Sequence, residues 1–404
     1  MAIFARRLRT REQNYLSRRL RTDCRMRLAI VCYPTHGGSG AVASDLAVGM
    51  ADAGHEVHVV SYAVPFRLRR FHPGIRLHEV EIASYPLFRY PPYTLGLATK
   101  LAEVANDEGD FDIIHAHYAV PNAVSAFLAR EIIGGGRTRV VTTLHGTDIT
   151  LVGADKSFHR VIRFALERSD AVTAVSDYLA DRTQRDFAPH VPVEVIPNFV
   201  DTELPAPGPE RYAREAWAPA GERILMHISN FRPVKRISDV VRVFAEVRRQ
   251  LPAKLVLVGE GPERLFAQQL VRELELTPDV VFLGQQDDIR GPLACADLLL
   301  LPSEQESFGL TALEAMVSRV PVIATTIGGL PEVVADGEAG RLFPVGEVRG
   351  MAAEAVRLLT DEPARRARGD AGRTRAITHF AREVVLPRYE DLYRRVMAGV
   401  PTGC

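Results

Sequence analysis

The stretch ADLLLLPSEQESFGLTALEA, residues 296–315, decides the fold. Its apolar run, residues 296–301, predicts a buried strand that stops at Pro302. A polar loop follows, and a helical pattern begins near Phe308. If Glu306 and Glu314 lay on one helix, their separation of eight positions would point the two side chains away from a common face. The two carboxylates can therefore serve one ligand only if Glu306 lies in the loop and Glu314 in the helix, as the pattern predicts.

The same loop brings the backbone of residues 307–310 to the start of the helix. The N–H groups of a first helical turn have no partner within the helix, so they point at any anion or hydroxyl above them. A capped helix with two solvated glutamates would give the same local pattern. The rest of the chain has to decide between these interpretations.

Length and charge restrict the class of protein. A chain of 404 residues predicts two or more domains with sizeable cores. The formal net charge is zero, but residues 1–25 hold eight arginines against Glu12 and Asp23. The remainder is therefore mildly acidic, which argues against nucleic acid as the main partner.

The N-terminal stretch and the cysteines bear on the compartment. We expect residues 1–25 to be a disordered basic extension, with Met26 as an alternative start; a transit peptide or a membrane-surface helix is the other interpretation. No apolar run reaches the length of a membrane span, so a membrane partner is not expected. The four cysteines show no paired spacing, which predicts neither a disulfide framework nor a zinc site and fits a cytoplasmic location.

Strand and helix patterns alternate in both halves of the chain. This alternation predicts an α/β protein with two doubly wound, mostly parallel sheets. We assign residues 26–200 to the first domain and 201–378 to the second, with the Pro- and Ala-rich segment 201–221 between them. Residues 64–100 are expected to be an irregular loop over a cleft.

Polar motifs follow the predicted strands at their carboxyl ends. They are GGSG (37–40), HAHY (115–118), HGTD (145–148), SNFRPVK (229–235), GEGP (259–262) and IGG (327–329). Ligands of open α/β sheets bind at this edge, so two such domains predict a cleft between them. Arg232 and Lys235 are the best cationic candidates for a diphosphate, although a solvated basic patch with Arg236 is the alternative. His115 and His117 lack a third ligand, so no metal site is predicted.

In combination, these motifs resemble the retaining glycosyltransferases of family 4, in which Glu306 and Glu314 match the E-x7-E signature. The resemblance implies the GT-B fold, with two Rossmann-like domains facing across a cleft. The pattern of residues 379–397 predicts an amphipathic helix, and the resemblance implies that this C-terminal segment, residues 379–404, crosses back onto the first domain. A homodimer, and no cofactor or metal beside the sugar nucleotide, are further implications.

The resemblance assigns roles to residues of this chain. Glu314 would hold the ribose hydroxyls of the donor, and Glu306 the sugar hydroxyls. Cations would stabilise charge on the departing diphosphate. The implied catalytic residues are His145, Arg232, Lys235 and Glu306. The implied donor-binding residues are Gly38, Ser39, Gly261, Ser307, Phe308, Gly309, Leu310 and Glu314.

Further segments resemble the family members that transfer N-acetylglucosamine from UDP-GlcNAc to L-malate, the first step of bacillithiol biosynthesis. These segments are CYP (32–34), PFRL (65–68), YPPY (90–93), HAHYA (115–119), TTLHGTDIT (142–150), IRF (162–164) and NFR (230–232). Malate is a small dianion whose pocket needs hydroxyl, amide and cationic donors. The residues that qualify are Ser39, Tyr118, Thr147, Arg163 and Asn230. SRVP (318–321) departs from the CGVP usual in the family.

Three other functions remain open at this point. A family 4 transferase could use another acceptor, such as an inositol phosphate or a lipid. A UDP-GlcNAc 2-epimerase of the same fold would consume the donor without an acceptor, and a nucleotide-sugar-binding protein would not catalyse at all. Retention of configuration is compatible with a covalent carboxylate intermediate. The family is instead thought to let the leaving phosphate oxygen take the proton of the acceptor.

Overall fold

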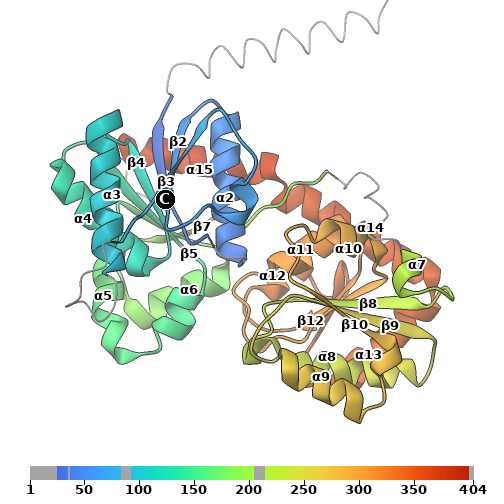
Figure 1. Ribbon diagram of the computed structural model, residues 1–404. Helices are drawn as coiled ribbons and strands as arrows, with labels where there is room; N and C mark the ends of the chain where they lie inside the picture. Colours follow the sequence, from blue (N-terminus) through green and yellow to red (C-terminus); the bar gives the residue numbers. More distant parts are fainter. Residues whose placement is uncertain (1–24, 35–36, 83–91, 204–213, 400–404) are drawn as a thin grey trace, which may run out of the picture.

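The computed structural model describes residues 25–34, 37–82, 92–203 and 214–399. It has two α/β domains, each with helices on both faces of one sheet (Figure 1). The arginine-rich residues 1–24, for which a disordered extension is expected, lie outside the described residues. No helix within the described ranges is both long and apolar enough to cross a membrane.

The first sheet has the strand order β3-β2-β1-β4-β5-β6-β7, and all its paired strands are parallel. Its strands are β1 (Arg27–Val31), β2 (Glu56–Ser61), β3 (Ile75–Glu79), β4 (Ile113–His117), β5 (Arg139–Leu144), β6 (Ala171–Ala174) and β7 (Val193–Val195). Its helices are α2 (Gly38–Asp52), α3 (Tyr93–Glu108), α4 (Val124–Ile133), α5 (Lys156–Glu167) and α6 (Asp177–Phe187), with the short turns η1 (Phe66–Leu68), η2 (Ala119–Ala123) and η3 (Asp148–Val152).

The second sheet has the order β10-β9-β8-β11-β12-β13 and is also parallel. Its strands are β8 (Arg223–Ile228), β9 (Ala253–Val258), β10 (Val280–Gly284), β11 (Leu298–Leu301), β12 (Val322–Thr325) and β13 (Gly340–Phe343). The remaining elements are α7 (Arg214–Trp217), η5 (Pro233–Lys235), α8 (Ile237–Arg248), α9 (Arg264–Glu273), η6 (Thr277–Asp279), α10 (Arg290–Cys295), α11 (Leu310–Val317), α12 (Leu330–Val334), α13 (Val348–Thr360), α14 (Glu362–Phe380) and α15 (Arg382–Met397).

In both sheets the first strand is central. Later strands are added on one side of it and then on the other, so the strand order reverses there. The strand order turns between β1 and β4 in the first sheet and between β8 and β11 in the second. Loops on either side of such a reversal diverge and leave a crevice at the carboxyl ends of the strands. The strands themselves form because their apolar runs are buried on both faces, as in Leu298–Leu301. The prediction of two doubly wound parallel sheets is confirmed.

Three local expectations differ from the structure. Residues 64–100, expected to be irregular, contain β3 and the first half of α3, because Val80 and Leu97 of this segment are buried in the core of the first domain. The segment expected to link the domains includes the short helix α7, which buries Trp217. The helix predicted to begin at His379 begins at Arg382, since α14 runs to Phe380 and the chain turns at Ala381.

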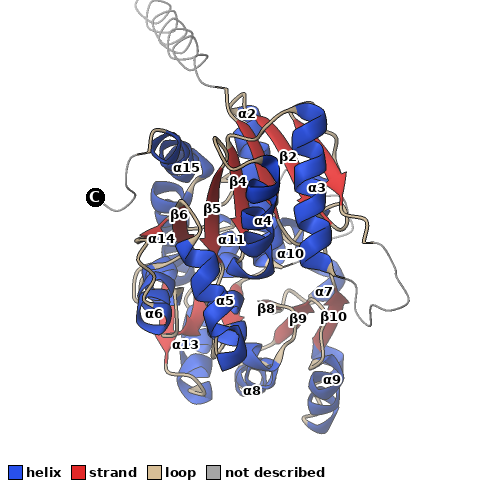
Figure 2. Cartoon of the chain, turned by 90° about the vertical axis from the view of Figure 1, so that its left-hand side faces the viewer, coloured by secondary structure: helices blue, strands red, loops and turns tan. Residues whose placement is uncertain are grey.

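Helix α15 packs on the first sheet although it follows the second domain in the chain (Figure 2). Tyr389 and Tyr393 are fully buried there, in one cluster with Leu28 and Ile30 of β1. The hydroxyl of Tyr393 also lies 2.7 Å from Nδ1 of His115 in β4. The core of the first domain is therefore completed from the far end of the described chain.

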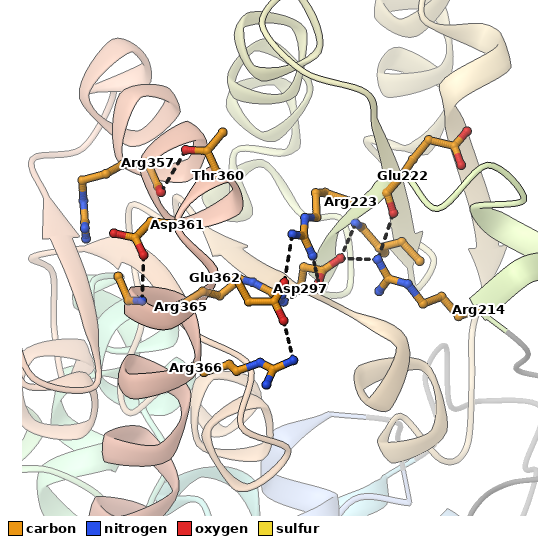
Figure 3. A network of polar contacts seen from close by, with 12 residues as sticks. Arg214, Glu222, Arg223, Asp297, Arg357, Thr360, Asp361, Glu362, Arg365 and Arg366 are labelled. Atoms are coloured by element: carbon orange, nitrogen blue, oxygen red, sulfur yellow. Dashed lines mark hydrogen bonds and ion pairs between the residues drawn. The ribbon is translucent and has the colours of Figure 1, made fainter.

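A buried carboxylate ties the second domain together (Figure 3). Asp297, 4% exposed, accepts a hydrogen bond from Arg214 at 2.5 Å and contacts Arg365 of α14. Its Oδ2 also accepts the backbone N–H of Ile224 in β8 at 2.8 Å. The charge of Asp297 is thus compensated by arginines from α7 and α14, which hold these helices against the sheet.

Candidate active site

The carboxyl ends of the two sheets face one another across a cleft, and this cleft contains two adjoining cavities. One cavity is lined mainly by the second domain and includes Glu314, Gly259 and Gln286, with Gly38 and Arg67 of the first domain opposite. The other brings the first domain's motifs to the loop after β11. It is lined among others by Ser39, Tyr118, His145, Thr147, Asn198, Asn230, Arg232, Lys235, Glu306, Ser307, Phe308, Gly309 and Leu310.

The loop after β11 is held in place by the loop after β12. Gly329 donates its N–H to the carbonyl of Glu306 at 3.0 Å. Any Cβ on Gly328 would overlap that carbonyl, so a glycine is required for the close approach of the two loops. Lys235 Nζ then donates to Glu306 Oε2 at 2.5 Å. The IGG motif therefore fixes the loop that presents Glu306 to the cleft.

Glu314 is a buried carboxylate whose charge is compensated from the other domain. Its side chain is 8% exposed, and its Oε1 accepts a hydrogen bond of 2.8 Å from Nη2 of Arg67 in η1. Burial raises the pKa of Glu314, and Arg67 opposes that rise. The guanidinium of Arg67 also contacts Asp45 of α2. The motif PFRL is the sequence signal for Arg67, but the motif alone does not give this residue a role.

The HGTD loop of the first domain touches the E-x7-E loop of the second. Gly146 has a φ of +115°, and a Cβ there would overlap Oγ of Ser307. Ser176, at the start of α6, donates to the carbonyl of Ser307 at 2.6 Å. Only a glycine permits this approach, so the two domains meet at the cleft itself.

His145 is neutral and is held by a second histidine. Its Nε2 lies 2.8 Å from Nδ1 of His117, and the two rings stack with centroids 5.0 Å apart. Burial lowers the pKa of His145 to about 3. The ring therefore carries no charge near neutral pH.

Hydroxyl groups gather beside His145. Tyr118 donates to Oγ of Ser39 at 2.9 Å and also bonds to the Thr147 side chain. Asp148 holds the two loops together, because its carboxylate accepts the N–H of Gly146 at 3.0 Å and that of Ala119 at 3.1 Å. Burial raises the pKa of Asp148 to about 6. These contacts place three hydroxyls on the first-domain wall of the cleft.

Arg232 precedes the turn η5 and Lys235 is its last residue, and both line the cavity of His145. Lys235 is paired with Glu306, whereas Arg232 has an exposed side chain and no ion-pair partner among the described residues. Gly38, at the first turn of α2, lies opposite Leu310, whose Cδ2 is 4.0 Å from the position of a Cβ on Gly38. An anion in this space would meet two cations and two helix N-termini.

Two predicted site residues lie outside the cavities. Arg163 pairs with Glu167 at 2.8 Å, one turn along α5, and does not line the cleft. Gly261 has a φ of +157°, and a Cβ there would overlap the carbonyl of Asn230, so this glycine packs two loops together. Both predictions rested on position in the sequence, which does not show where a side chain points.

Sequence reasoning also missed Asn198. It follows β7, is 5% exposed and lines the cavity of His145, and its Oδ1 has no hydrogen-bond partner. An unpaired polar atom at such a place is a candidate contact for a ligand. Its position after a strand's carboxyl end was the available signal.

A potential metal cluster lies elsewhere. Among the described residues, His58, His78 and Glu108 are close enough together to hold an ion. None of the three lines the cavities of the cleft.

Comparison with known proteins gives the class. The family model described as Glycosyltransferase Family 4 matches residues 36–204, and the one described as Glycosyl transferases group 1 matches residues 210–375. The chain belongs to the family 4 glycosyltransferases, and it is an enzyme of the hexosyltransferase kind with the GT-B fold. The family resemblance predicted from the sequence is confirmed.

The chain is also similar to individual members of the family. The chain is 45% identical to N-acetyl-alpha-D-glucosaminyl L-malate synthase of Bacillus anthracis, over 94% of this chain and 99% of that protein. It is 29% identical to D-inositol 3-phosphate glycosyltransferase of Thermobispora bispora, over 91% and 92% of the two chains. The solved structure of Anabaena Alr3699/HepE with UDP-glucose superposes with a TM-score of 0.75 at 23% identity, covering 91% of this chain and 99% of that one. This last likeness supports the fold.

Proposed function

We propose that this protein transfers N-acetylglucosamine from UDP-GlcNAc to the hydroxyl of L-malate with retention of configuration, the first step of bacillithiol biosynthesis. The observation that carries the proposal is the 45% identity to the Bacillus anthracis synthase over nearly the whole of both chains. The cleft between the domains supplies groups suited to both substrates.

The donor is held mainly by the second domain. Glu314 accepts the ribose hydroxyls, and Glu306 with the amides of residues 307–309 binds the hydroxyls of the sugar. Arg232 and Lys235, with the amide of Leu310 and the first turn of α2 at Gly38, receive the diphosphate. These groups stabilise the negative charge that grows as the bond from the anomeric carbon to the phosphate breaks.

The acceptor lies against the first domain. Ser39, Tyr118 and Thr147 offer hydroxyls to a malate carboxylate, and Asn230 offers an amide. Arg163 does not line this cavity. The proposal therefore gives the role of the cation that faces the malate carboxylate to Arg232, which is exposed and lines the cavity. His145 lies beside the anomeric carbon. The leaving phosphate oxygen takes the proton of the malate hydroxyl, so the charge it acquires is neutralised as the new bond forms.

The test is UDP release from UDP-GlcNAc by the purified protein, with and without L-malate. We expect malate-dependent release and a GlcNAc-malate product in the mass spectrum. Donor consumption without malate would overturn the proposal in favour of an epimerase or a hydrolase. Release that requires inositol 3-phosphate in place of malate would assign the protein to the acceptor class of its Thermobispora bispora relative.

The assembly is tested in the same preparation. The family resemblance implies a homodimer, and each protomer carries a complete cleft because both walls of the cavity come from one chain. Light scattering gives the mass of the particle, and a monomer with full activity would contradict the dimer.

A further inference from the structure

A second histidine, His117, lies beside His145 of the cleft and has no role in the proposed reaction so far. His117, at the end of β4, is fully buried, with its ring stacked between those of His115 and His145 at centroid distances of 4.5 and 5.0 Å. Its Nδ1 faces Nε2 of His145 at 2.8 Å, whereas its own Nε2 is buried without a partner. His117 does not line the cleft, so it can act only through His145.

Only one proton lies between the two facing nitrogens. Burial lowers the pKa of His145 to about 3 and that of His117 well below its ordinary value, so both rings are neutral near pH 7. Each neutral ring carries one N–H and one bare nitrogen. Either His145 donates through Nε2 or His117 donates through Nδ1.

The unpartnered nitrogen of His117 decides between these two arrangements. If His145 were the donor, His117 would carry its proton on Nε2, as a buried N–H without an acceptor. If His117 is the donor, its Nε2 is a bare lone pair. A buried N–H without a partner is the rarer and more costly defect. The second arrangement therefore holds, and it places the proton of His145 on Nδ1.

We infer that His117 is a positioning residue that fixes His145 in the Nδ1–H tautomer, and so makes the cleft histidine a neutral hydrogen-bond donor instead of a base. Nδ1 of His145 has no partner among the described residues, is not among their buried unpaired atoms, and belongs to a ring that lines the cleft. It offers its N–H to an oxygen of the substrate. This inference rests on the proposed function for the identity of that oxygen, on the sugar or on the phosphate.

The inference agrees with the proposed path of the proton. A histidine whose Nε2 accepts from His117 and whose Nδ1 already carries a proton has no lone pair to offer the acceptor hydroxyl. The proton must then go elsewhere, and the leaving phosphate oxygen is a group that gains negative charge in the reaction. His145 would strengthen its hydrogen bond to an oxygen as that oxygen becomes more negative.

Two variants at His117 separate the tautomer from simple packing. The amide nitrogen of an asparagine lies where Nδ1 of a histidine lies, so His117→Asn keeps a donor toward His145. His117→Asp has the same shape but offers only an acceptor when ionised, so it should reverse the tautomer of His145. We expect His117→Asn to keep kcat within about threefold. His117→Asp should lose about 100-fold in kcat while KM for UDP-GlcNAc changes less than threefold, as expected for a lost transition-state contact.

A direct readout does not depend on activity. Nitrogen-15 NMR of the histidine-labelled, ligand-free protein distinguishes protonated from bare ring nitrogens, with His145→Gln identifying the signal of His145. We expect a protonated Nδ1 and a bare Nε2 in the wild type, and the reverse in His117→Asp. A bare Nδ1 in the wild type overturns the inference even if neither variant folds, and so do equal kcat losses in the two variants. Absence of transferase activity would overturn the proposed function and leave the NMR result to stand alone.

Discussion

Arg67 of the first domain donates a hydrogen bond of 2.8 Å to Glu314 of the second, across the cleft. Glu314 is the carboxylate proposed to bind the donor ribose, and burial raises its pKa while Arg67 opposes that rise. The ionised form of this carboxylate is therefore favoured by a residue of the other domain. We therefore expect donor binding at Glu314 to depend on this contact between the domains.

The first prediction is a double-mutant cycle on the pair. Glu314→Gln should weaken UDP binding by at least about tenfold, or about 1.4 kcal/mol, because an amide is a poorer acceptor for ribose hydroxyls. Arg67→Met should weaken it similarly by favouring the neutral carboxyl. The double variant should be little worse than either single variant, as measured by calorimetry. Glu304→Gln, on the same loop but outside the cavities, is the control, and strictly additive losses would contradict the coupling.

Lys235→Ala should strongly reduce turnover without unfolding the protein. The ammonium lies 2.5 Å from Glu306 and is proposed to stabilise the leaving diphosphate. Its loss should lower kcat by about 100- to 1000-fold. The measurement is UDP release, with the thermal midpoint recorded for the same sample. Arg249→Ala removes an exposed cation of the second domain paired with Glu246 and should leave both quantities unchanged. Undiminished turnover in Lys235→Ala would contradict the proposed role of Lys235 in stabilising the leaving diphosphate.

Gly146→Ala should hold the two domains apart. The added Cβ would overlap Ser307, and the φ of +115° is unfavourable for alanine. We expect kcat/KM to fall by at least about tenfold and the radius of gyration in X-ray scattering to rise. The double variant Gly146→Ala with Ser307→Gly removes the overlap and should regain part of the activity lost. Ser307→Gly alone is the control, and a double variant no better than Gly146→Ala would leave only backbone strain as the cause.

Asp297→Ala should destabilise the second domain. Removing the carboxylate leaves Arg214 and Arg365 without their buried partner, which typically costs about 3 kcal/mol. Glu362→Ala removes a carboxylate of the same network that is 40% exposed, and should cost less than about 1 kcal/mol. Thermal melting compares them. Equal shifts of the thermal midpoint in the two variants would show that the burial of Asp297 does not increase its contribution to stability.

Acid should destabilise the protein through its buried histidines. Burial lowers the pKa of His227 from 6.5 to about 4. Between these values the unfolded ring binds a proton that the folded ring does not, so stability is full above pH 6.5. It falls as the pH drops toward 4, by about 1.4 kcal/mol per pH unit. His227→Asn should show a shallower fall of the thermal midpoint from pH 6.5 to 5. Ser229→Ala removes a hydroxyl that bonds to Nε2 of His227 and to the N–H of Phe231. It leaves the buried ring in place and should keep most of the wild-type slope.

Local patterns made much of the architecture predictable. The sequence pattern predicts strands at residues 139–144, 322–325 and 340–343. The strands β5, β12 and β13 have these bounds, because short apolar runs between turn residues admit few alternatives. Glu306 lies in a loop and Glu314 in a helix, as their spacing predicts. In contrast, β3 was missed because an edge strand that is half exposed has no continuous apolar run.

Long-range contacts were not predictable in the same way. The pairing of Arg67 with Glu314 joins residues 247 positions apart, and no local pattern encodes it. The same holds for Asn198, whose unpaired Oδ1 is visible only once the cavity is formed. Arg163 shows the converse case, since its motif placed it at the site but its nearest carboxylate, one helical turn away, keeps it elsewhere.

The packing of α15 on β1 has a consequence for the order of biogenesis. The ribosome synthesises β1 early, and it synthesises Tyr389 and Tyr393 only after the whole second domain. The apolar face of the first sheet that α15 covers therefore stays exposed until the end of synthesis. The second domain, although later in the chain, can reach its final structure first. A premature stop just before α15 would therefore damage the opposite end of the molecule, and the nascent first domain is the part that most needs protection by a chaperone.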